Sequence, residues 1–274
     1  EVHGFSNIEQ LVERYSIKRI LLAIPNTANE RRREILNDLA RMPLYINTVP
    51  DINDLVTGKI DQPQIRDIEI GDLLGRDTVP PEEQLLINAI QGKCILITGA
   101  AGTIGAELSR KILESNPAKL VLYDNSEFGL YRLEQDLDRG ARSKTEVTVL
   151  LGSILNPGHL LNVINSFSVE KVFHAAAYKH VPLVEQNIIE GVRNNVLGTW
   201  QVANAVAESE ATELVMISSD KAVRPTNVMG ATKRLAELII QGFADQAREN
   251  VTGKKFSMVR FGNVLRSSGS VVPL

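Results

Sequence analysis

Three glycines at regular spacing follow an apolar run in the middle of the chain. The run Ile95-Leu-Ile-Thr98 leads into Gly99, Gly102 and Gly105, and a helical pattern starts at Ala106. The first glycine permits a tight turn, the second lets backbone approach a pyrophosphate, and the third lets helix pack closely on strand. The helix N-terminus adds free N–H groups and a positive dipole end. This pattern predicts a phosphate-binding loop; a glycine-rich turn without a ligand is the alternative.

A carboxylate at the end of the next apolar run supports the first interpretation. Asp124 closes the run Lys119-Leu-Val-Leu-Tyr-Asp124 and lies 19 residues beyond Gly105. This spacing is typical of an acid that binds the ribose 2′-hydroxyl of a dinucleotide. Because the carboxylate would repel a 2′-phosphate, the two motifs together favour NAD over NADP.

Two further segments follow apolar runs and contain small or polar residues. Gly152-Ser153-Ile154 is placed to border the adenine, and His174-Ala-Ala-Ala-Tyr-Lys-His180 comes next along the chain. The three alanines let the backbone lie against a cofactor, and Lys179 and His180 are candidates for reaching the pocket. The alternative for His180 is a residue that merely precedes a helix. Asn195 falls in a helical pattern, where an asparagine is usually solvated.

The densest polar cluster is Ser218-Ser-Asp-Lys221, followed by a helical segment that begins near Met229. Met229 and Lys233 are four residues apart and therefore share a helix face. From Gly92 to its end, the chain resembles the short-chain dehydrogenases and reductases, in which a helical lysine is directed at the nicotinamide ribose. These enzymes have tyrosine in place of Met229. Methionine carries no proton at neutral pH, so acid–base work shifts to Ser219, Asp220 and Lys221. A core methionine and an exposed ion pair remain the alternatives.

Three longer motifs narrow this resemblance. They are Ser218-Ser-Asp-Lys-Ala-Val-Arg-Pro-Thr-Asn-Val-Met-Gly-Ala-Thr-Lys-Arg234, His174-Ala-Ala-Ala-Tyr-Lys-His-Val-Pro-Leu-Val-Glu185 and Val259-Arg-Phe-Gly-Asn-Val-Leu265. The motifs resemble the nucleotide-sugar 4,6-dehydratases of polysaccharide biosynthesis. The chain most resembles the large, membrane-anchored bacterial UDP-N-acetylglucosamine 4,6-dehydratases, which also have methionine in place of tyrosine. Many relatives have threonine where Ser219 stands, and either residue supplies a hydroxyl.

The resemblance implies an internal redox cycle in which NAD takes hydride from C4 of the sugar and returns it to C6 after water is lost. It makes Lys221 the base at C5 and Asp220 the acid at C6. Both must start uncharged, which requires a lowered lysine pKa and a raised aspartate pKa. Ser219 would hydrogen-bond the C4 hydroxyl, and Lys233 would bind the ribose.

The motifs and the resemblance together predict three groups of site residues and no metal. The catalytic group is Ser219, Asp220, Lys221, Met229 and Lys233. The group expected to bind NAD is Gly99, Ala101, Gly102, Thr103, Ile104, Gly105, Asp124, Asn125, Ser126, Gly152, Ser153, Ile154, Ala175, Ala176, Ala177 and Lys233. The group expected to bind the substrate UDP-N-acetylglucosamine is Lys179, His180, Asn195, Asn263 and Val264.

The elements that must position these residues alternate between strand and helix, after a helix at Glu82–Ile90. Strands are predicted at Cys94–Thr98, Leu120–Tyr123, Glu146–Leu151, Lys171–Ala175, Glu213–Ser218 and Lys255–Phe261. Such alternation indicates an α/β fold with a doubly wound parallel sheet, of the Rossmann type seen in extended short-chain dehydrogenases. Ligands bind beyond the carboxyl ends of such strands, which is where the polar motifs lie.

The N-terminal part has a helix, strand, helix, strand pattern without a glycine loop. Its elements are expected at Ile8–Tyr15, Lys18–Ile24, Glu30–Arg41 and Leu44–Val49. The predicted organisation is a partial Rossmann-like region at 1–66, a linker at 67–80 and the catalytic domain at 81–274. The aperiodic segment that contains the linker spans Gln62–Pro81. We expect both ends to be cut and the C-terminal substrate region to be missing.

Composition sets the remaining expectations. The 274 residues are 43% hydrophobic with a net charge of −3, which gives no sign of nucleic-acid binding. Cys94 is the single cysteine, which fits a reducing compartment. No apolar run is long enough to cross a membrane. The resemblance implies a parent protein anchored in the bacterial inner membrane by preceding segments, with this part on the cytoplasmic face. Homo-oligomerisation, a 4-epimerase or 4-dehydrogenase activity, and an NAD-binding fragment without turnover stay open.

Overall fold

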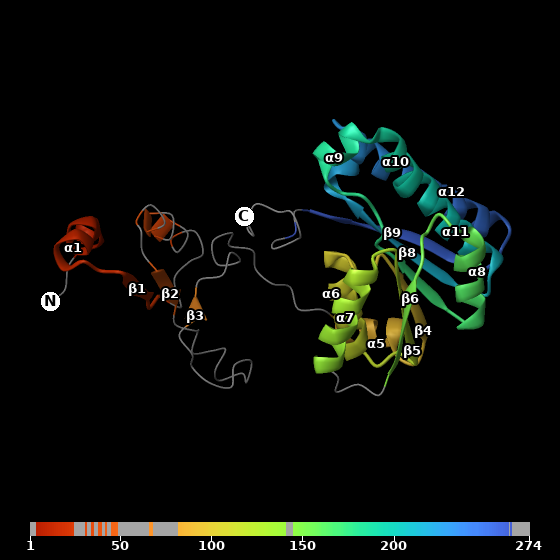
Figure 1. Cartoon of the computed structure of the whole chain (residues 1–274), viewed down its shortest axis with the longest axis horizontal. Helices are drawn as coiled ribbons and strands as arrows, with labels where there is room; N and C mark the ends of the chain where they lie inside the picture. Colours follow the sequence, from red (N-terminus) through yellow and green to blue (C-terminus); the bar gives the residue numbers. More distant parts are fainter. Residues whose placement is uncertain are drawn as a thin grey trace. The chain divides into compact units, whose positions relative to one another are not determined.

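The chain forms two compact units, Glu1–Pro80 and Pro81–Leu274. The computed structural model, shown in Figure 1, describes residues 4–24, 31, 34–35, 38–39, 42, 45–48, 66–67, 82–140, 145–262 and 264. In these residues, no helix combines the length and the apolar character needed to span a bilayer. The glycine loop and the other motifs lie in the larger unit.

The smaller unit contains a three-stranded sheet with strand order β1-β2-β3. Its elements are η1 (Phe5–Asn7), α1 (Ile8–Tyr15), β1 (Arg19–Leu22), β2 (Tyr45–Thr48) and β3 (Arg66–Asp67). β1 and β2 are parallel, and β3 is antiparallel to β2. Leu22 and Leu39 are the buried centre of a small apolar cluster. Within the aperiodic segment, Arg66–Asp67 forms a short strand that pairs with β2.

The larger unit is a six-stranded parallel sheet with strand order β6-β5-β4-β7-β8-β9. The strands are β4 (Cys94–Thr98), β5 (Lys119–Asp124), β6 (Glu146–Leu151), β7 (Lys171–His174), β8 (Glu213–Ser219) and β9 (Lys255–Phe261). Every neighbouring pair is parallel. The doubly wound sheet is therefore confirmed, and each predicted strand end lies within one residue of the observed end.

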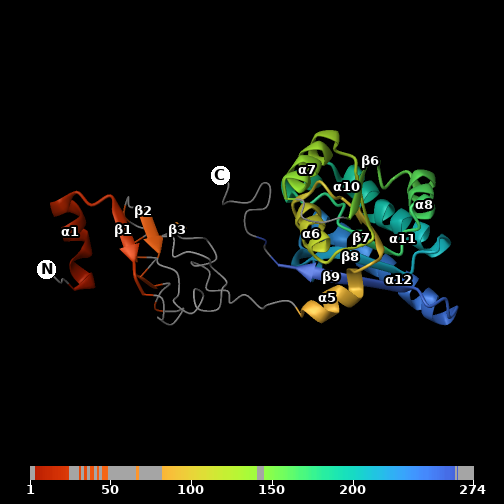
Figure 2. The same cartoon turned by 90° about the horizontal axis from the view of Figure 1, so that it is seen from below.

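Helices cover both faces of this sheet, as the two views in Figure 1 and Figure 2 show. They are α5 (Glu83–Ile90), α6 (Thr103–Glu114), α7 (Glu127–Gly140), α8 (Pro157–Ser166), α9 (Val181–Gln186), α10 (Ile188–Val192), the π-helix η2 (Arg193–Leu197), α11 (Gly198–Glu208), the 3₁₀-helix η3 (Asp220–Ala222) and α12 (Val228–Glu249). One face carries α5, α6 and α7, and the other carries α8, α11 and α12.

Side-chain alternation along the central strands supplies both apolar layers. Ile95 and Ile97 of β4 pack in the cluster that includes residues of α5, α6 and α7. Leu96 points to the opposite cluster, which includes residues of α8, α11 and α12. All five residues of β4 are buried, which explains why this strand appears as a continuous apolar run. Because β4 is packed on both faces, its carboxyl end, where the glycine loop begins, is held in a fixed position.

Candidate functional site

The loops after β4 and β7 diverge at one edge of the sheet. β4 is hydrogen-bonded to both β5 and β7, and the next strand along the chain lies on the far side of each. This is a topological switch point, where loops leave the sheet in opposite directions and a crevice opens beyond the carboxyl ends. The glycine loop after Thr98 and the alanine segment after His174 border this crevice.

Close backbone contacts explain two of the three glycines. Gly99 has φ of 73°, a left-handed conformation that favours glycine, and a Cβ there would overlap the backbone of Ala176. A Cβ on Gly105 would overlap the carbonyl oxygen of Gly99. Gly102 is the N-cap of α6 and has extended backbone. The loop therefore presents backbone N–H groups and a helix N-terminus to the crevice, an arrangement that fits a diphosphate.

Asp124 joins the end of β5 to the glycine loop. Its Oδ2 accepts a hydrogen bond from the Ala101 N–H at 3.0 Å, and its Oδ1 accepts one from the Ser126 N–H at 2.9 Å. Carboxylate oxygens have further lone pairs, so a ribose hydroxyl remains an available donor. Asp124 thus supports the loop and keeps oxygen lone pairs available for the predicted contact with the ribose.

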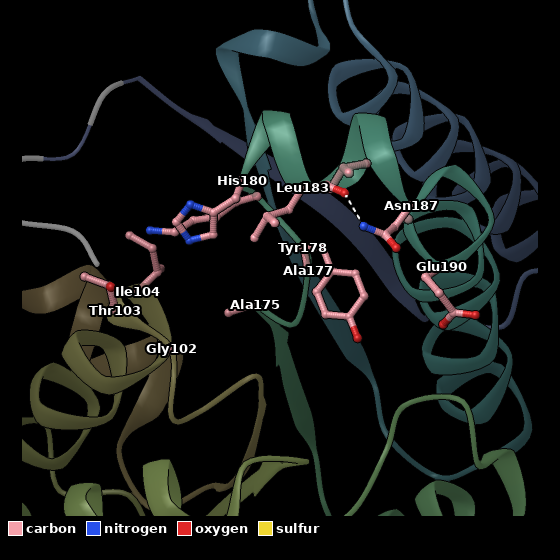
Figure 3. A pocket seen from close by; sticks show the side chains of 14 residues that line it. Gly102, Thr103, Ile104, Ala175, Ala177, Tyr178, His180, Leu183, Asn187 and Glu190 are labelled. Carbon is pink, nitrogen blue, oxygen red and sulfur yellow. Dashed lines mark hydrogen bonds between the residues drawn. The ribbon is translucent and has the colours of Figure 1, made fainter. Parts of the chain in front are cut away.

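Two cavities occupy the crevice. The larger has a volume of about 450 Å³ and is bordered by the start of α6, the segment Ala175–His180 and the region of α9 and α10 (Figure 3). The smaller has a volume of about 140 Å³ and includes Asp124 and Gly152 in its wall. The predicted NAD-binding residues that line one or both cavities are Gly99, Gly102, Thr103, Ile104, Gly105, Asp124, Asn125, Gly152, Ile154, Ala175, Ala176 and Ala177.

Other members of the predicted NAD-binding group support the walls. Ala101 and Ser126 donate their N–H groups to Asp124. Ser153 accepts a hydrogen bond at its carbonyl from the Tyr123 hydroxyl, at 3.0 Å. Gly152 lies against the Tyr123 ring so closely that a Cβ would overlap it. The described residues contain no group of three side chains able to hold a metal ion.

A buried histidine connects β4, β7 and α11. His174 Nδ1 lies 2.8 Å from Thr98 Oγ1, and Nε2 lies 3.1 Å from Thr199 Oγ1. Because Thr199 donates its hydroxyl proton to the Asn195 carbonyl, the pattern assigns the proton of the neutral ring to Nε2. Burial lowers the pKa of His174 to about 3, with a smaller contribution from the charge of Lys233. His174 is therefore a neutral structural residue that fixes the start of the alanine segment.

Asn195 has a different environment from the one predicted. It lies in the π-helix η2 and is fully buried, with 0% exposure. Its Oδ1 accepts from the Tyr178 N–H at 2.8 Å, and its Nδ2 donates to the Tyr178 carbonyl at 3.0 Å and to Thr232 Oγ1 at 3.0 Å. Protein groups bind both ends of the amide, so Asn195 holds the Tyr178 backbone. The contact of Asn195 with substrate stays a prediction.

Ser219, Asp220 and Lys221 form a tight turn at the end of β8. The Ser219 hydroxyl donates to Asp220 Oδ1 at 3.0 Å, and Lys221 Nζ lies 3.4 Å from the same oxygen. Both charged side chains are exposed, 53% for Asp220 and 41% for Lys221. The hydrogen bond from Ser219 lowers the pKa of Asp220, with the charge of Lys221 adding to the effect. The pKa of Asp220 is thus lowered here. The raised pKa that the resemblance implies for a closed pocket stays a prediction.

The first turns of α12 carry Met229 and Lys233. Met229 is buried, and Lys233 donates from Nζ to the Ile217 carbonyl at 2.7 Å. Burial lowers the pKa of Lys233 to about 8. The Asn227 side chain caps this helix, and Glu185 of α9 accepts from the Val228 N–H at 2.7 Å. Neither Met229 nor Lys233 lines the two cavities, and the same holds for Ser219, Asp220 and Lys221.

A hydrogen-bond network around a buried carboxylate lies behind the turn Ser219–Lys221. Glu237 of α12 is fully buried and accepts from Ser218 Oγ at 2.7 Å, Arg234 Nη1 at 2.9 Å and two nitrogens of Arg260 at 2.8 and 2.7 Å. The hydrogen bonds from Arg260 are the main cause that lowers the pKa of Glu237 to about 2. Glu237 therefore joins α12 to the ends of β8 and β9.

The predicted substrate residues lie in different places. Lys179 and His180 line the larger cavity, and burial lowers the pKa of Lys179. Val264 is exposed and outside both cavities, whereas Asn263 lies outside the described residues. The larger cavity is also lined by residues that were not predicted from the sequence, among them Tyr178, Leu183, Asn187 and Glu190. Tyr178 could have been predicted, because it lies between Ala177 and Lys179 in a motif whose other residues were assigned to the site.

Comparisons with known proteins agree with this architecture. Residues 95–274 match the family profile "Polysaccharide biosynthesis protein". The chain is 40% identical to the capsular polysaccharide biosynthesis protein CapD of Staphylococcus aureus, over 100% of this chain and 45% of CapD. It is 33% identical to a UDP-N-acetylglucosamine 4,6-dehydratase (inverting) of Campylobacter jejuni, over 66% of this chain and 52% of that protein.

The chain is also similar to an epimerase in sequence and to a solved bacterial structure in fold. A UDP-glucose 4-epimerase of Rickettsia canadensis is 33% identical over 66% of this chain and 52% of its own length. The solved structure of Pen from Bacillus thuringiensis superposes with a TM-score of 0.62 and 33% identity, covering 67% of this chain and 56% of that chain. The chain thus spans about half the length of these relatives. It shares its fold with solved structures of an epimerase and a dehydratase.

Proposed function

This chain belongs to the polysaccharide biosynthesis protein family, and from that premise we propose that it is the NAD-binding, catalytic part of a nucleotide-sugar 4,6-dehydratase. The proposed substrate is UDP-N-acetylglucosamine, and the product is a UDP-4-keto-6-deoxy sugar used in polysaccharide or glycan synthesis. We place the longer parent protein at the cytoplasmic face of the bacterial inner membrane. The dehydratase relative from Campylobacter jejuni supports the reaction.

The residues of the crevice fit NAD. The cradle formed by Gly99 and Gly105 has no room for side chains, and α6 begins beside it, so a diphosphate can approach the backbone. Asp124 lines the smaller cavity as an acceptor for ribose hydroxyls. When bound, NAD would supply the hydride acceptor and donor that an internal redox reaction needs.

The observation that carries the proposal is the turn at the end of β8. A carboxyl and an amine lie 3.4 Å apart there, while buried Met229 occupies the helix position where a proton-carrying tyrosine would otherwise stand. Removal of the C5 proton needs a base and departure of the C6 hydroxyl needs an acid, roles that we assign to Lys221 and Asp220. An epimerase needs neither group.

The hydrogen bond within this turn sets a condition on the acid. Asp220 can donate a proton only after gaining one, and the Ser219 hydroxyl that donates to it favours the ionised form. We assign Ser219 to the C4 hydroxyl of the sugar. Contact with that hydroxyl would draw Ser219 away from Asp220, and burial under the sugar would then raise the carboxyl pKa.

The product mass tests the proposal directly. The full-length protein, incubated with UDP-N-acetylglucosamine, is expected to give a nucleotide sugar lighter than the substrate by one water. A product of unchanged mass would instead support the second candidate, a UDP-sugar 4-epimerase, which the similarity to the Rickettsia canadensis protein favours. Cofactor binding without any product would leave only an NAD-binding role.

The substitution Lys221→Ala tests the assigned base. We expect turnover to fall by about a hundredfold or more, since a positioned base contributes on that scale. Solvent deuterium should no longer enter the sugar at C5, while NAD binding survives. The matched control is Lys111→Ala, an exposed lysine on α6 whose ion pair with Glu114 lies on the helix surface. Retained turnover in Lys221→Ala would refute the assignment.

A further inference from the structure

Among the residues that the structure describes, four line both cavities of the crevice and form a shared wall. Gly102, Ala175, Ala177 and Tyr178 line both the larger and the smaller cavity. Three of these have no side chain beyond Cβ. Of these four described residues, Tyr178 has the one side chain large enough to cover a ligand that extends from one cavity into the other.

Tyr178 combines a fixed backbone with an exposed ring. The side-chain amide of Asn195, a residue with 0% exposure, binds both the N–H and the carbonyl of Tyr178. Tyr178 is nevertheless 45% exposed. No hydrogen bond from its hydroxyl occurs within the described part of the chain. In Figure 3 the ring projects from the alanine segment into the open space that faces Glu190.

The chemistry at either end of the shared wall matches the two parts of a dinucleotide. Asp124, an acceptor for ribose hydroxyls, lines only the smaller cavity, and the N-terminal residues Thr103 and Ile104 of α6 line only the larger one. A ligand bound at both places passes Tyr178. An aromatic side chain offers a broad apolar surface with only two torsions to immobilise, which suits it to covering such a ligand.

We propose that Tyr178 is a positioning residue that retains NAD, by laying its ring over the cofactor where the two cavities meet. This inference rests on the proposed function, in which the cofactor returns to its starting state and need not leave between turnovers. Because Asn195 holds the Tyr178 backbone in place, release of the cofactor requires only that the Tyr178 side chain rotate away.

The dissociation rate of NAD tests this inference without any sugar substrate. Radiolabelled NAD is bound to the full-length protein, an excess of unlabelled NAD is added, and retained label is followed with time. Tyr178→Ala is expected to raise the dissociation rate by about tenfold or more, in line with the loss of an aromatic contact and its buried area. Tyr178→Phe should restore slow release, because the ring rather than the hydroxyl covers the cofactor.

Two further variants complete the test. Tyr131→Ala removes an exposed ring on α7 and is the matched control, with release expected at the wild-type rate. Tyr178→Leu keeps an apolar side chain without a ring; it should also release NAD faster, and it replaces the alanine variant if that one does not fold. Wild-type release rates in folded Tyr178→Ala or Tyr178→Leu would overturn the inference and leave the dehydratase proposal intact. A wild-type protein that binds no NAD would instead overturn the proposed function.

Discussion

At the scale of single residues, the most strongly hydrogen-bonded side chains near the crevice hold backbone in place. Asn195 clamps Tyr178, and Asp124 holds the N–H groups of Ala101 and Ser126. The sequence predicted Asp124 from its spacing to Gly105, because that spacing follows from the βαβ unit itself. It did not predict the burial of Asn195, because burial depends on how the segment 193–197 winds, and no local pattern reports a π-helix.

Asp124→Ala separates the two roles of this carboxylate. If Asp124 contacts the ribose, NAD affinity should fall by about tenfold to hundredfold, the scale of a lost hydrogen bond to a charged group. NADP affinity should fall much less, because the repulsion of its 2′-phosphate is also removed. Calorimetric titration with both dinucleotides measures the two changes. An equal loss for NAD and NADP would mean that Asp124 acts only by supporting the loop, and Asp138→Ala on α7 is the exposed control.

At the scale of elements, the start of α12 and the turn η3 depend on one glycine. A Cβ on Gly230 would overlap the carbonyl oxygen of Lys221, so the helix can approach the turn η3 only with glycine there. The strands of the larger unit were predictable because buried parallel strands give continuous apolar runs. β3 was not, because two residues that pair at a sheet edge leave no periodicity to detect.

Gly230→Ala should therefore displace the turn that carries Asp220 and Lys221. We expect unfolding free energy to fall by about 1–3 kcal/mol, the usual cost of overpacking, and kcat to fall while NAD affinity is kept. Urea denaturation and steady-state kinetics measure these effects. Gly242→Ala in the same helix is the matched control, because a Cβ there meets nothing within 4 Å. That variant should be stabilised by up to about 1 kcal/mol, the helix preference of alanine over glycine. Equal behaviour of the two variants would contradict the contact.

At the scale of the whole molecule, the carboxylate of Glu237 makes the folding stability of the larger unit depend on pH in the acid range. Its carboxylate holds α12 to β8 and β9 through Ser218 and Arg260. The strong interactions lower its pKa from 4.5 to about 2. Between those values the unfolded chain binds more protons than the folded one, so stability is present above pH 4.5 and is lost as pH falls toward 2. The shift corresponds to about 3 kcal/mol.

Stability measured as a function of pH checks this account. Urea midpoints of the wild-type protein should decline between about pH 4.5 and 2. Glu237→Gln should be markedly less stable at pH 7, with the difference shrinking toward pH 2 as the wild-type carboxylate becomes protonated. Glu107→Gln, an exposed residue on α6, is the control and should follow the wild type. A constant difference between wild type and Glu237→Gln at all pH values would refute the assigned pKa.

The structure around the π-helix η2 depends on the number of residues in that helix as well as on their identity. A π-helix contains one residue more than an α-helix of the same rise, and here that surplus turns Asn195 inward. Removing any one residue from 193–197 would tighten the turn and rotate the preceding side chains by about 100° relative to α11. Asn195 and Thr199 would then no longer face Tyr178 and His174 together. Exchanges of side chain on the outer surface of this turn are therefore tolerable in a way that a single-codon deletion is not.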